Sequence, residues 1–508
     1  MKVRFLLVAA IAALFTSGSA QNSPPGIDSI SNIVVIFAEN RSFDDLYGSF
    51  PGANGLKQAP PGSFTQVDRD GAALKEFPPV WQGLTAAGVT PPVTEAQSAH
   101  LPNQPFAIDD PQGFHQSLNI VTRDLVHRFY QNQMQIDGGK NDGFVAWGDS
   151  GALVMGHYDG SKLQMWNVAR QYVLADNFFM GVFGSSFLNH FWLICACIPK
   201  YPQADQSPAK DQIAAVEADG VTLKVAPNSK KSAIDGPPRF VKDGNLTPDF
   251  YAVNTMQPPY QPSASKPAPG GDPAMADPAN PSTLPPQTEQ TIGDLLSAKG
   301  ISWAWYGGAW QAALSGKNGR PIPNFQYHHQ PFNYFASMAP GTAERAKHLK
   351  DGGLGGDRFM EAIKAGALEQ VVFYKPQGNL NEHAGYADVQ SGDAHIADLI
   401  VQLQKSPQWS HMVVIVTHDE NGGFWDHVAP PKGDRWGPGI RIPAIVVSPF
   451  AKRGFVDHTA YDTTSILRLI TKRFQLPVLP GIRSRDESVK ANGGAPFGDL
   501  TNALTLSN

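Results

Sequence analysis

The chain has 508 residues and a formal net charge of -5. This length allows one large α/β domain with insertions, or two to three average domains. The charge carries no basic excess, and no Lys/Arg cluster resembles a nucleic-acid patch. The composition therefore argues against a nucleic-acid partner and favours small-molecule or surface substrates.

The first 20 residues have the layout of a secretory signal peptide. Lys2 and Arg4 precede an apolar stretch over residues 5–15, and small residues follow up to Ala20. The stretch is too short to span a membrane, and no later run approaches the roughly 20 apolar residues that a spanning helix needs. We expect cleavage after Ala20, export to the periplasm or the medium, no transmembrane segment, and a single mature catalytic domain over 21–508.

Two continuous β-branched and aromatic runs, residues 33–37 and 412–416, have the composition of strands buried on both faces of a parallel sheet. Further strand-like runs cover 301–306, 371–374 and 444–447, and amphipathic helical stretches cover 291–299 and 393–405. This alternation predicts an α/β fold. In open sheets of this kind ligands bind beyond the carboxyl ends of the strands.

Two segments interrupt this alternation. Residues 257–287 are dense in Pro, Ser, Ala and Gly, a composition that cannot bury a core and predicts a long loop or insertion. Cys195 and Cys197 lie in the apolar run 191–198, where a strand would point both side chains to the same face. An oxidising compartment would allow a short-loop disulfide, but we favour a buried thiol pair.

A mostly polar hexapeptide, residues 39–44, follows the first buried run directly. Glu39 and Asn40 stand at its start, in a place where loops usually carry function. Ser42 or Asn40 can also serve as the N-cap of a helix that begins near Phe43. The segment alone leaves a metal or substrate role and a capping role equally open.

A second acidic segment follows the other buried run. Asp419 and Glu420 come first, and Asp426 and His427 lie beyond a double glycine. Three carboxylates and an imidazole this close in sequence are hard ligands suited to a divalent cation. Solvated surface charge is the alternative, but a strand this apolar that ends in consecutive acids favours a site.

Ser185 and Ser186 follow a glycine at a predicted strand-to-helix turn, which can aim a hydroxyl outward. Taken alone, a serine here is more simply explained as the N-cap of the next helix. No Gly-x-Ser-x-Gly elbow appears, which argues against a serine hydrolase triad.

Four histidines lie in polar or aromatic settings, at His127, His328, His329 and His383. Each of them alone is more simply structural. Together with the acidic strand ends and the serine turn, they suggest a phosphoryl site in which imidazolium and metal neutralise the equatorial oxygens.

Taken in order, these motifs resemble the bacterial phosphoesterase family that contains the non-specific phospholipases C and exported acid phosphatases. The motifs that carry the resemblance lie at residues 39–44, 138–144, 184–189, 328–332, 381–383 and 419–427. They span nearly the whole mature chain. The resemblance implies an alkaline-phosphatase-like α/β/α core with a mostly parallel sheet.

The resemblance also implies roles by position. One divalent metal ion, which the mixed ligand shell does not identify, would be bound by Glu39, Asn40, Ser186, Asp419 and Glu420. Ser186 matches the nucleophile, with Ser185 as its control, and the phosphate-contacting or acid/base groups match His127, His328, His329 and His383. The roles of Asn189, Asp426 and His427 stay uncertain, either behind the ligands or elsewhere.

Two departures distinguish the branches of the family. The run Gly184-Ser185-Ser186 stands where phospholipases C typically show Gly-Pro-Thr, and His190 stands where they show Arg. Both favour a phosphomonoesterase with a phosphoserine intermediate and, if its histidines act protonated, an acidic optimum. The alternatives are a phospholipase C that acts on phosphodiesters at a phospholipid surface, and a non-catalytic homologue that binds metal and phosphate.

Overall fold

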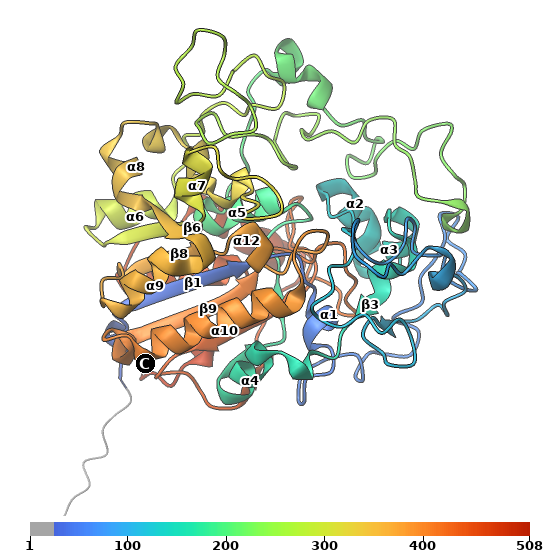
Figure 1. Ribbon diagram of the computed structural model, residues 1–508, viewed down its shortest axis with the longest axis horizontal. Helices are drawn as coiled ribbons and strands as arrows, with labels where there is room; N and C mark the ends of the chain where they lie inside the picture. The colour runs from blue at the N-terminus through green and yellow to red at the C-terminus, as the bar shows by residue number, and fades with distance from the viewer. Residues whose placement is uncertain (1–24, 508) are drawn as a thin grey trace, which may run out of the picture.

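The computed structural model describes residues 25–507 and has an eight-stranded sheet at its centre (Figure 1). Along the sheet the strands follow the order β11 (Phe455–Asp457), β4 (Val173–Ala175), β10 (Ala444–Val447), β9 (Met412–His418), β1 (Asn32–Ala38), β8 (Val371–Lys375), β6 (Trp303–Gly308) and β7 (Leu349–Gly353). Neighbouring strands pair in parallel, except that β10 runs antiparallel to β4 and β9. The predicted α/β fold with a mostly parallel sheet is confirmed.

Each of the five strand-like runs in the sequence forms a strand of this sheet. β1 and β9 lie side by side at its centre and are buried along their whole length. Because helices cover both faces, neither strand shows the alternation of a half-exposed strand. Two small sheets lie outside, formed by β2 (Phe106–Ala107) with β3 (Gly156–His157) and by β5 (Phe178–Phe179) with β12 (Tyr461–Asp462).

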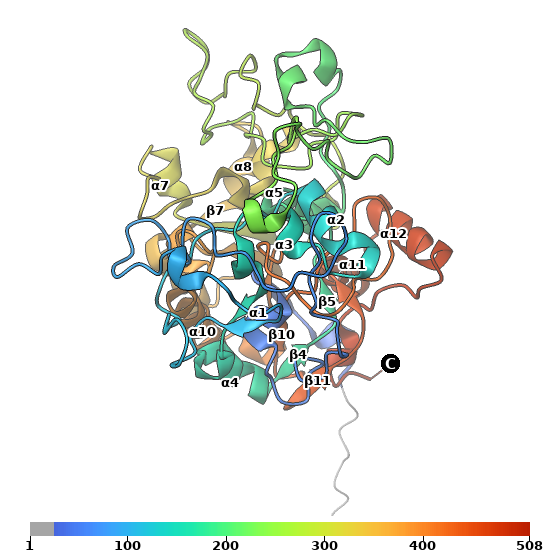
Figure 2. The same ribbon diagram turned by 90° about the vertical axis from the view of Figure 1, so that its right-hand side faces the viewer.

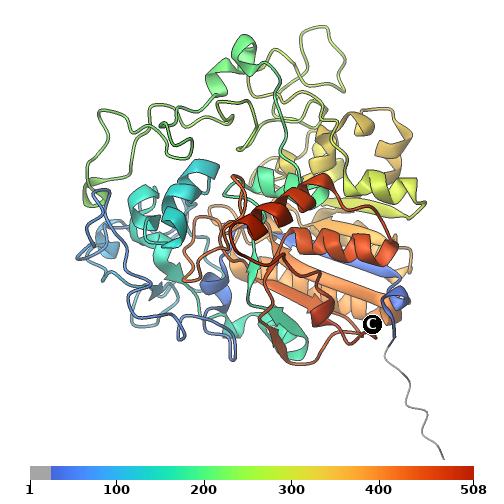
Figure 3. The same ribbon diagram turned by 180° about the vertical axis from the view of Figure 1, so that it is seen from behind.

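Helices form a layer on each face of the sheet. In front of it in Figure 1, α10 (Val389–Lys405) packs beside α4 (Gln164–Gln171) and α9 (Asp357–Lys364). On the opposite face, seen in Figure 3, α5 (Ser186–Cys195) packs beside α11 (Thr464–Phe474) and α6 (Ile292–Ala298). The other helices are α1 (Phe43–Tyr47), α2 (Phe129–Ile136), α3 (Phe144–Trp147), α7 (Trp310–Leu314), α8 (Ala343–His348) and α12 (Pro480–Ala491). The result is an α/β/α sandwich.

Between α5 and α6 the chain forms only short 3-10 turns and isolated β-bridges, seen as the green loops above the sandwich in Figure 2. The Pro-rich segment 257–287 belongs to this region and runs as a loop. It is pinned by bridges from Gln257 to Thr283 and from Tyr260 to Met275. Leu284 is fully buried in the common core, so the segment adds to that core although it builds none of its own.

The cysteine-containing run differs from its prediction. Residues 191–195 continue the helix predicted to start at Ser186, α5, rather than form a strand, and every side chain of this helix is buried. A short apolar stretch of a buried helix shows no clear periodicity, which is why the run 191–195 resembles a buried strand. Cys195 ends the helix and is joined by a disulfide to Cys197, so the expected thiol pair is also wrong.

The predicted signal peptide lies outside the described residues, so cleavage after Ala20 stays a prediction. In residues 25–507, no helix combines the length and the apolar character that crossing a bilayer requires.

Candidate active site

The two acidic segments meet because their strands are neighbours. Parallel pairing aligns Ala38 with His418, so Glu39 and Asp419 leave the sheet side by side. The backbone N–H of Asp419 donates to Ala38 O (3.1 Å), and that of Asn40 donates to Asp419 Oδ1 (3.0 Å). Asn40 adopts a left-handed conformation with φ of 59°, which asparagine tolerates better than most residues. All four predicted ligands at these strand ends are fully buried.

Of the two residues predicted as a possible helix N-cap, Ser42 has this role and Asn40 does not. The Ser42 side chain accepts a hydrogen bond from the backbone N–H of Asp45 and caps α1. Asn40 instead turns its amide into the site, where Nδ2 donates to His383 Nε2 (2.9 Å). One hexapeptide therefore supplies both a helix cap and a site residue.

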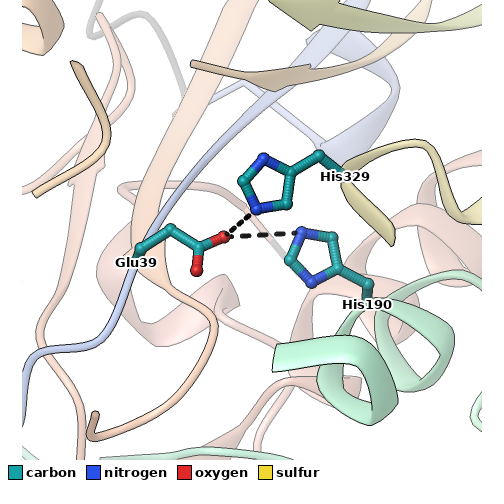
Figure 4. Close-up of side chains that lie close together, drawn as sticks. All are labelled: Glu39, His190 and His329. Carbon is teal, nitrogen blue, oxygen red and sulfur yellow. Dashed lines mark ion pairs between the residues drawn. The ribbon is translucent and has the colours of Figure 1, made fainter. Parts of the chain in front are cut away.

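Glu39 lies among cationic and imidazole groups that come from three elements. Its Oε1 forms an ion pair with the buried Lys375 ammonium. The same oxygen lies 2.9 Å from His329 Nε2 and 3.9 Å from His190 Nε2, and Figure 4 shows both rings facing it. Burial raises the pKa of Glu39, but the charges of Lys375 and His329 outweigh it and hold the pKa well below its usual value. Glu39 is thus a carboxylate in the folded protein.

Lys375 and His190 were absent from the predicted site. Lys375 ends β8, the strand next to β1, so a lysine at the carboxyl end of a buried run was the available signal. His190 lies one helical turn after Ser186 in α5, a spacing that places both on one face of the helix. Its ring stacks on His329 with centroids 5.4 Å apart.

Ser186 is the first residue of α5, and its hydroxyl faces the acidic strand ends. Oγ donates to Glu420 Oε1 (3.2 Å) and to Asn40 Oδ1 (3.3 Å) as alternative acceptors. Ser185 occupies the N-cap position without a capping hydrogen bond from its side chain. Of the two serines, Ser186 is therefore the one whose oxygen contacts the predicted ligands.

The turn before Ser186 is held in a conformation that requires glycine. Gly184 has φ of +51°, and a Cβ built there would lie 2.4 Å from the carbonyl carbon of Arg128. Asn189 braces the same turn, since its Nδ2 donates to Gly184 O (2.8 Å) and its Oδ1 accepts from Val182 N–H (3.2 Å). Asn189 thus supports the turn and does not line the cavity beside Ser186.

Ser186 opens onto a cavity of about 220 Å³ with a strongly polar lining. His127, His328 and His383 line it together with Arg128 and Arg320, whereas His329 lies behind them against Glu39. Nearby cations and hydrogen-bond donors are what a bound phosphate requires. The structure therefore brings three of the four predicted histidines to the cavity and places the fourth beside a predicted ligand.

The four histidines differ in their electrostatic surroundings. Burial lowers the pKa of His329 to about 4, and it also lowers the pKa values of His328 and His383. Burial opposes the charged form of His127 as well, but Glu420 and Asp124 outweigh it and raise this pKa to about 9.

Several side-chain groups are close enough to bind a metal ion, among them Glu39 with His190 and His329. The predicted oxygen ligands fit a cation for another reason. Glu39 Oε2 and Asp419 Oδ2 are buried and accept no hydrogen bond from the described residues. Burial, followed by the charge of Glu39, raises the pKa of Asp419 well above its usual range, and burial raises that of Glu420 to about 7. Such excess negative charge is what a bound divalent ion offsets.

Asp426 and His427 belong to a different cluster, although the sequence places them just after Asp419 and Glu420. His427 Nδ1 lies 2.6 Å from Asp44 Oδ2, and Asp426 accepts from Asp44 N–H (3.0 Å). Arg441 reaches both acids, with Nη2 on Asp44 Oδ1 and Nε on Asp426 Oδ1, each at 3.1 Å. The side chains of Asp44, Asp426 and His427 could also hold a metal ion, but the guanidinium already supplies positive charge to both acids.

A family model described as the Phosphoesterase family matches residues 30–477. The chain belongs to this family. Phospholipase C A of Mycobacterium tuberculosis is 23% identical over 538 residues, which cover 99% of this chain and 82% of that protein. The non-hemolytic phospholipase C of Burkholderia pseudomallei is 29% identical over 255 residues, which cover 43% of this chain and 33% of that protein.

Among solved structures, a protein of the alkaline phosphatase superfamily from Vibrio parahaemolyticus matches with a TM-score of 0.31 and 10% identity. The match covers 65% of this chain and 64% of that one. A TM-score this low supports no comparison of individual residues. Hydrolysis of phosphoric esters follows from the family itself.

Proposed function

We propose that this phosphoesterase works by transferring a phosphoryl group to Ser186 and then to water. The observation that supports this proposal is the position of Ser186 Oγ, which lies between Glu420 and Asn40 at the N-terminus of α5. Ser186 also lines a cavity whose other lining residues include arginines and histidines. The helix terminus and the cationic side chains favour a bound phosphate. An oxygen aimed at that phosphate is a nucleophile in position.

In the first step the Ser186 oxygen bonds to phosphorus while the bond from phosphorus to the alcohol oxygen breaks. A histidine of the cavity, which His127, His328 and His383 line, protonates the departing oxygen, whereas His329 faces Glu39. Water then attacks phosphorus and releases Ser186. Arg128 and Arg320 hold the phosphoryl oxygens throughout.

The oxygens of Glu39, Asn40, Ser186, Asp419 and Glu420 would bind one divalent metal ion, which supplies positive charge that lowers the pKa of the serine hydroxyl. Glu39 Oε2 and Asp419 Oδ2, which accept no hydrogen bond from the described residues, support this set of ligands. The alternative set of Glu39, His190 and His329 is less suitable, because Lys375 and His329 already contact Glu39 Oε1.

The substrates that we propose first are phosphodiesters of the phospholipid type. Phospholipase C A, a relative that matches nearly the whole chain, carries this activity in its name. A phosphomonoesterase of acidic optimum is the second candidate, favoured by Ser186 and His190 at positions where phospholipases C typically show Thr and Arg. We also propose export of the mature protein, on the basis of residues 1–20.

The experiment compares hydrolysis of p-nitrophenyl phosphorylcholine with that of p-nitrophenyl phosphate across pH, before and after chelation. We expect diester turnover to exceed monoester turnover and chelation to abolish both. Dominant monoester turnover below neutrality would instead select the second candidate. No turnover of either substrate by metal-loaded protein would contradict catalysis altogether.

Ser186→Ala should lower kcat by at least about 10³-fold, the scale of loss when a covalent nucleophile is removed. Ser185→Ala is the matched control and should retain activity within about tenfold. Trapping turnover in acid and sequencing the phosphopeptide should place the phosphate on Ser186. If Ser186→Ala kept its activity and Ser185→Ala lost it, the nucleophile would be Ser185 and the assignment to Ser186 would be wrong.

A further inference from the structure

Two charged residues of the sequence motifs, Arg41 and Glu382, have no role in the proposed reaction. Arg41 belongs to the segment 39–44 and Glu382 to the segment 381–383, and their exposed fractions are only 1% and 3%. Neither occurs among the described residues that line the catalytic cavity. Side chains this buried do not reach a substrate, so any part that they take in the reaction acts through a neighbour.

Glu382 has a backbone conformation that few residues of its type adopt. Its φ is 75°, in the left-handed region, where a side chain with a Cβ is strained. Such strain persists only where the surroundings impose the conformation, and it is concentrated at functional sites. His383, the next residue, lines the catalytic cavity, so this turn sets where its ring lies.

Hydrogen bonds from the segment after β1 hold the backbone of this turn. Arg41 Nε and Nη2 both donate to Glu382 O, at 3.1 and 2.8 Å. The backbone N–H of Glu39 donates to Asn381 O (2.9 Å). Arg41 is itself held by an ion pair of its Nη1 with Asp45 Oδ2 (3.2 Å). The turn is therefore clamped to the end of β1.

The side chain of Glu382 ties the same turn to the end of β9. Its Oε2 lies 2.6 Å from Nε2 of His418, the last residue of that strand. The other ring nitrogen of His418 is buried and has no hydrogen-bond partner among the described residues, so the contact with Glu382 is what orients this ring. Helix α10 has a glycine where Glu382 passes, since a Cβ built at Gly392 would lie 2.4 Å from Glu382 Cγ.

His383 connects this anchored turn to the reacting groups. Its ring stacks on Tyr386 with centroids 4.2 Å apart. Nδ1 donates to Ala384 O, which leaves Nε2 to accept from Asn40 Nδ2 (2.9 Å). With its Nδ2 on His383, the Asn40 amide turns Oδ1 toward Ser186 Oγ at 3.3 Å. A shift of the His383 ring would therefore also release the Asn40 amide.

We propose that Arg41 and Glu382 are positioning residues that hold His383 at the cavity and, through it, the oxygen of Asn40 at Ser186. This inference rests on the proposed function and adds two residues that serve the reaction without touching the substrate. When either contact is lost, the ring and the amide leave the arrangement in which Ser186 attacks phosphorus.

The test measures kcat and KM of the full chain with bound metal, on whichever p-nitrophenyl ester the unmodified protein turns over faster. Glu382→Ala should lower kcat about 10- to 100-fold and leave KM within about threefold, because the phosphate-binding arginines stay in place. Glu382→Gln keeps the side-chain length and a hydrogen bond to His418, so it should retain kcat within about fivefold. Arg41→Lys keeps the charge beside Asp45 but loses the paired hydrogen bonds to Glu382 O, and it should lower kcat about tenfold.

A double-mutant cycle separates positioning from a general loss of stability. In a His383→Ala background, Glu382→Ala should change kcat by less than about twofold, because the group that it positions is already absent. Glu344→Ala is the matched control, since Glu344 pairs with the buried His348 in the same way, at 3.0 Å. Glu344 lies in α8, which contributes no residue to the described lining of the catalytic cavity, and its loss should leave kcat unchanged.

The results that overturn the inference are distinguishable from failure of the proposed function. An equal loss of kcat from Glu382→Ala with and without His383 would mean that Glu382 acts on another part of the site. Full kcat in well-folded Glu382→Ala and Arg41→Lys, with loss of activity in Ser186→Ala, would leave the proposed function standing and remove both positioning roles.

Two further measurements complete the test. If Glu382→Ala does not fold, Arg41→Lys takes its place in the cycle with His383→Ala and is judged by the same criterion. Glu382→Gly relieves the strained φ but loses the contact with His418, so it should be as slow as Glu382→Ala; full activity of this variant would contradict the role of the Glu382 side chain. No turnover of either ester by the unmodified protein would remove the proposed function and this inference with it.

Discussion

Two acidic clusters lie at the same edge of the sheet and are built from the same two segments. The segment after β1 gives Glu39 to one cluster and Asp44 to the other, and the segment after β9 gives Asp419 to one and Asp426 to the other. Both clusters are buried, and both contain histidine. By residue type and spacing alone they are equivalent candidates for a metal site. The cluster with Glu39 and Asp419 is here called the Ser186 cluster, and the one with Asp44 and Asp426 the second cluster.

Their charge balance separates them. In the second cluster, Arg441 and His427 face Asp44 and Asp426, and backbone N–H groups of Asp44, His427 and Val428 supply further hydrogen bonds. Burial acts to raise the pKa of Asp44, but His427 and Arg441 outweigh it and lower this pKa. For Asp426, burial outweighs the charge of Arg441 and raises the pKa to about 6. The Ser186 cluster instead holds three carboxylates against Lys375 and His127, and Glu39 Oε2 and Asp419 Oδ2 accept no hydrogen bond from the described residues.

The comparison teaches that unsatisfied charge, and not the number of acids, distinguishes a binding site from a structural network. A buried carboxylate that lacks a partner costs free energy that a bound cation recovers. A carboxylate already paired with an internal guanidinium gains nothing from a metal, because that place is taken. The two clusters should therefore respond in opposite ways to loss of charge.

The largest expected effect on stability follows removal of the internal cation. Arg441→Met should lower the free energy of unfolding by about 3–5 kcal/mol, because it leaves two buried carboxylates without their partner. Urea unfolding of the metal-loaded protein measures the change. Arg435→Met is the control, since Arg435 pairs with Asp249 on the surface with 53% of its side chain exposed, and it should cost less than about 1 kcal/mol. Equal losses would show that the second cluster is no more than a surface-like ion pair.

A smaller effect of opposite sign is expected at the Ser186 cluster. Asp419→Asn should weaken binding of a divalent ion about 100-fold and should raise the thermal midpoint in chelator, because it removes a buried charge whose Oδ2 accepts no hydrogen bond from the described residues. Calorimetric titration and thermal melts of both forms measure these changes.

Asp426→Asn provides the matched substitution in the other cluster. It should leave metal affinity unchanged and lower the thermal midpoint, because it removes one acceptor of Arg441. If both variants lost metal affinity alike, the distinction between the clusters by charge balance would be wrong.

The sequence predicted the strands well and the site in part, for physical reasons. A strand buried on both faces leaves an uninterrupted apolar run, and β1 and β9 both follow this rule. Parallel pairing then brings their ends together, so Glu39 and Asp419 could be placed without coordinates. The C-terminal half of helix α5, residues 191–195, misled the same reasoning, since a buried apolar stretch of helix has a similar composition.

Partners that come from distant segments were beyond sequence reasoning. Arg441 lies 15 residues from Asp426 but 397 from Asp44, and nothing local indicates that it faces both. Lys375 reaches Glu39 only because β8 neighbours β1 in the sheet. Charge balance is a property of the fold, so the sequence could propose both clusters without distinguishing them.

The smallest effect concerns the pH dependence of the second cluster. Burial lowers the pKa of His427, but the hydrogen bond and charge of Asp44 outweigh it and raise the pKa above its usual value. A raised pKa in the folded state means that the pair stabilises fully below about pH 6.5 and that this contribution fades as pH rises through the raised value. The lowered pKa of Asp44 means that the contribution also fades as pH falls from about 3.9 through the lowered value.

His427→Gln should therefore lower the free energy of unfolding by about 1 kcal/mol near pH 6 and by less at higher pH, where the wild-type pair has lost its charge. Urea unfolding at a series of pH values measures the difference between the two proteins. His100→Gln is the control, since His100 pairs with Glu76 at the surface with 79% of its side chain exposed and should change little at any pH. If the difference in the free energy of unfolding between wild type and His427→Gln grew with pH, the neutral imidazole would be what stabilises the network. The positive charge that balances the second cluster would then come from the Arg441 guanidinium alone.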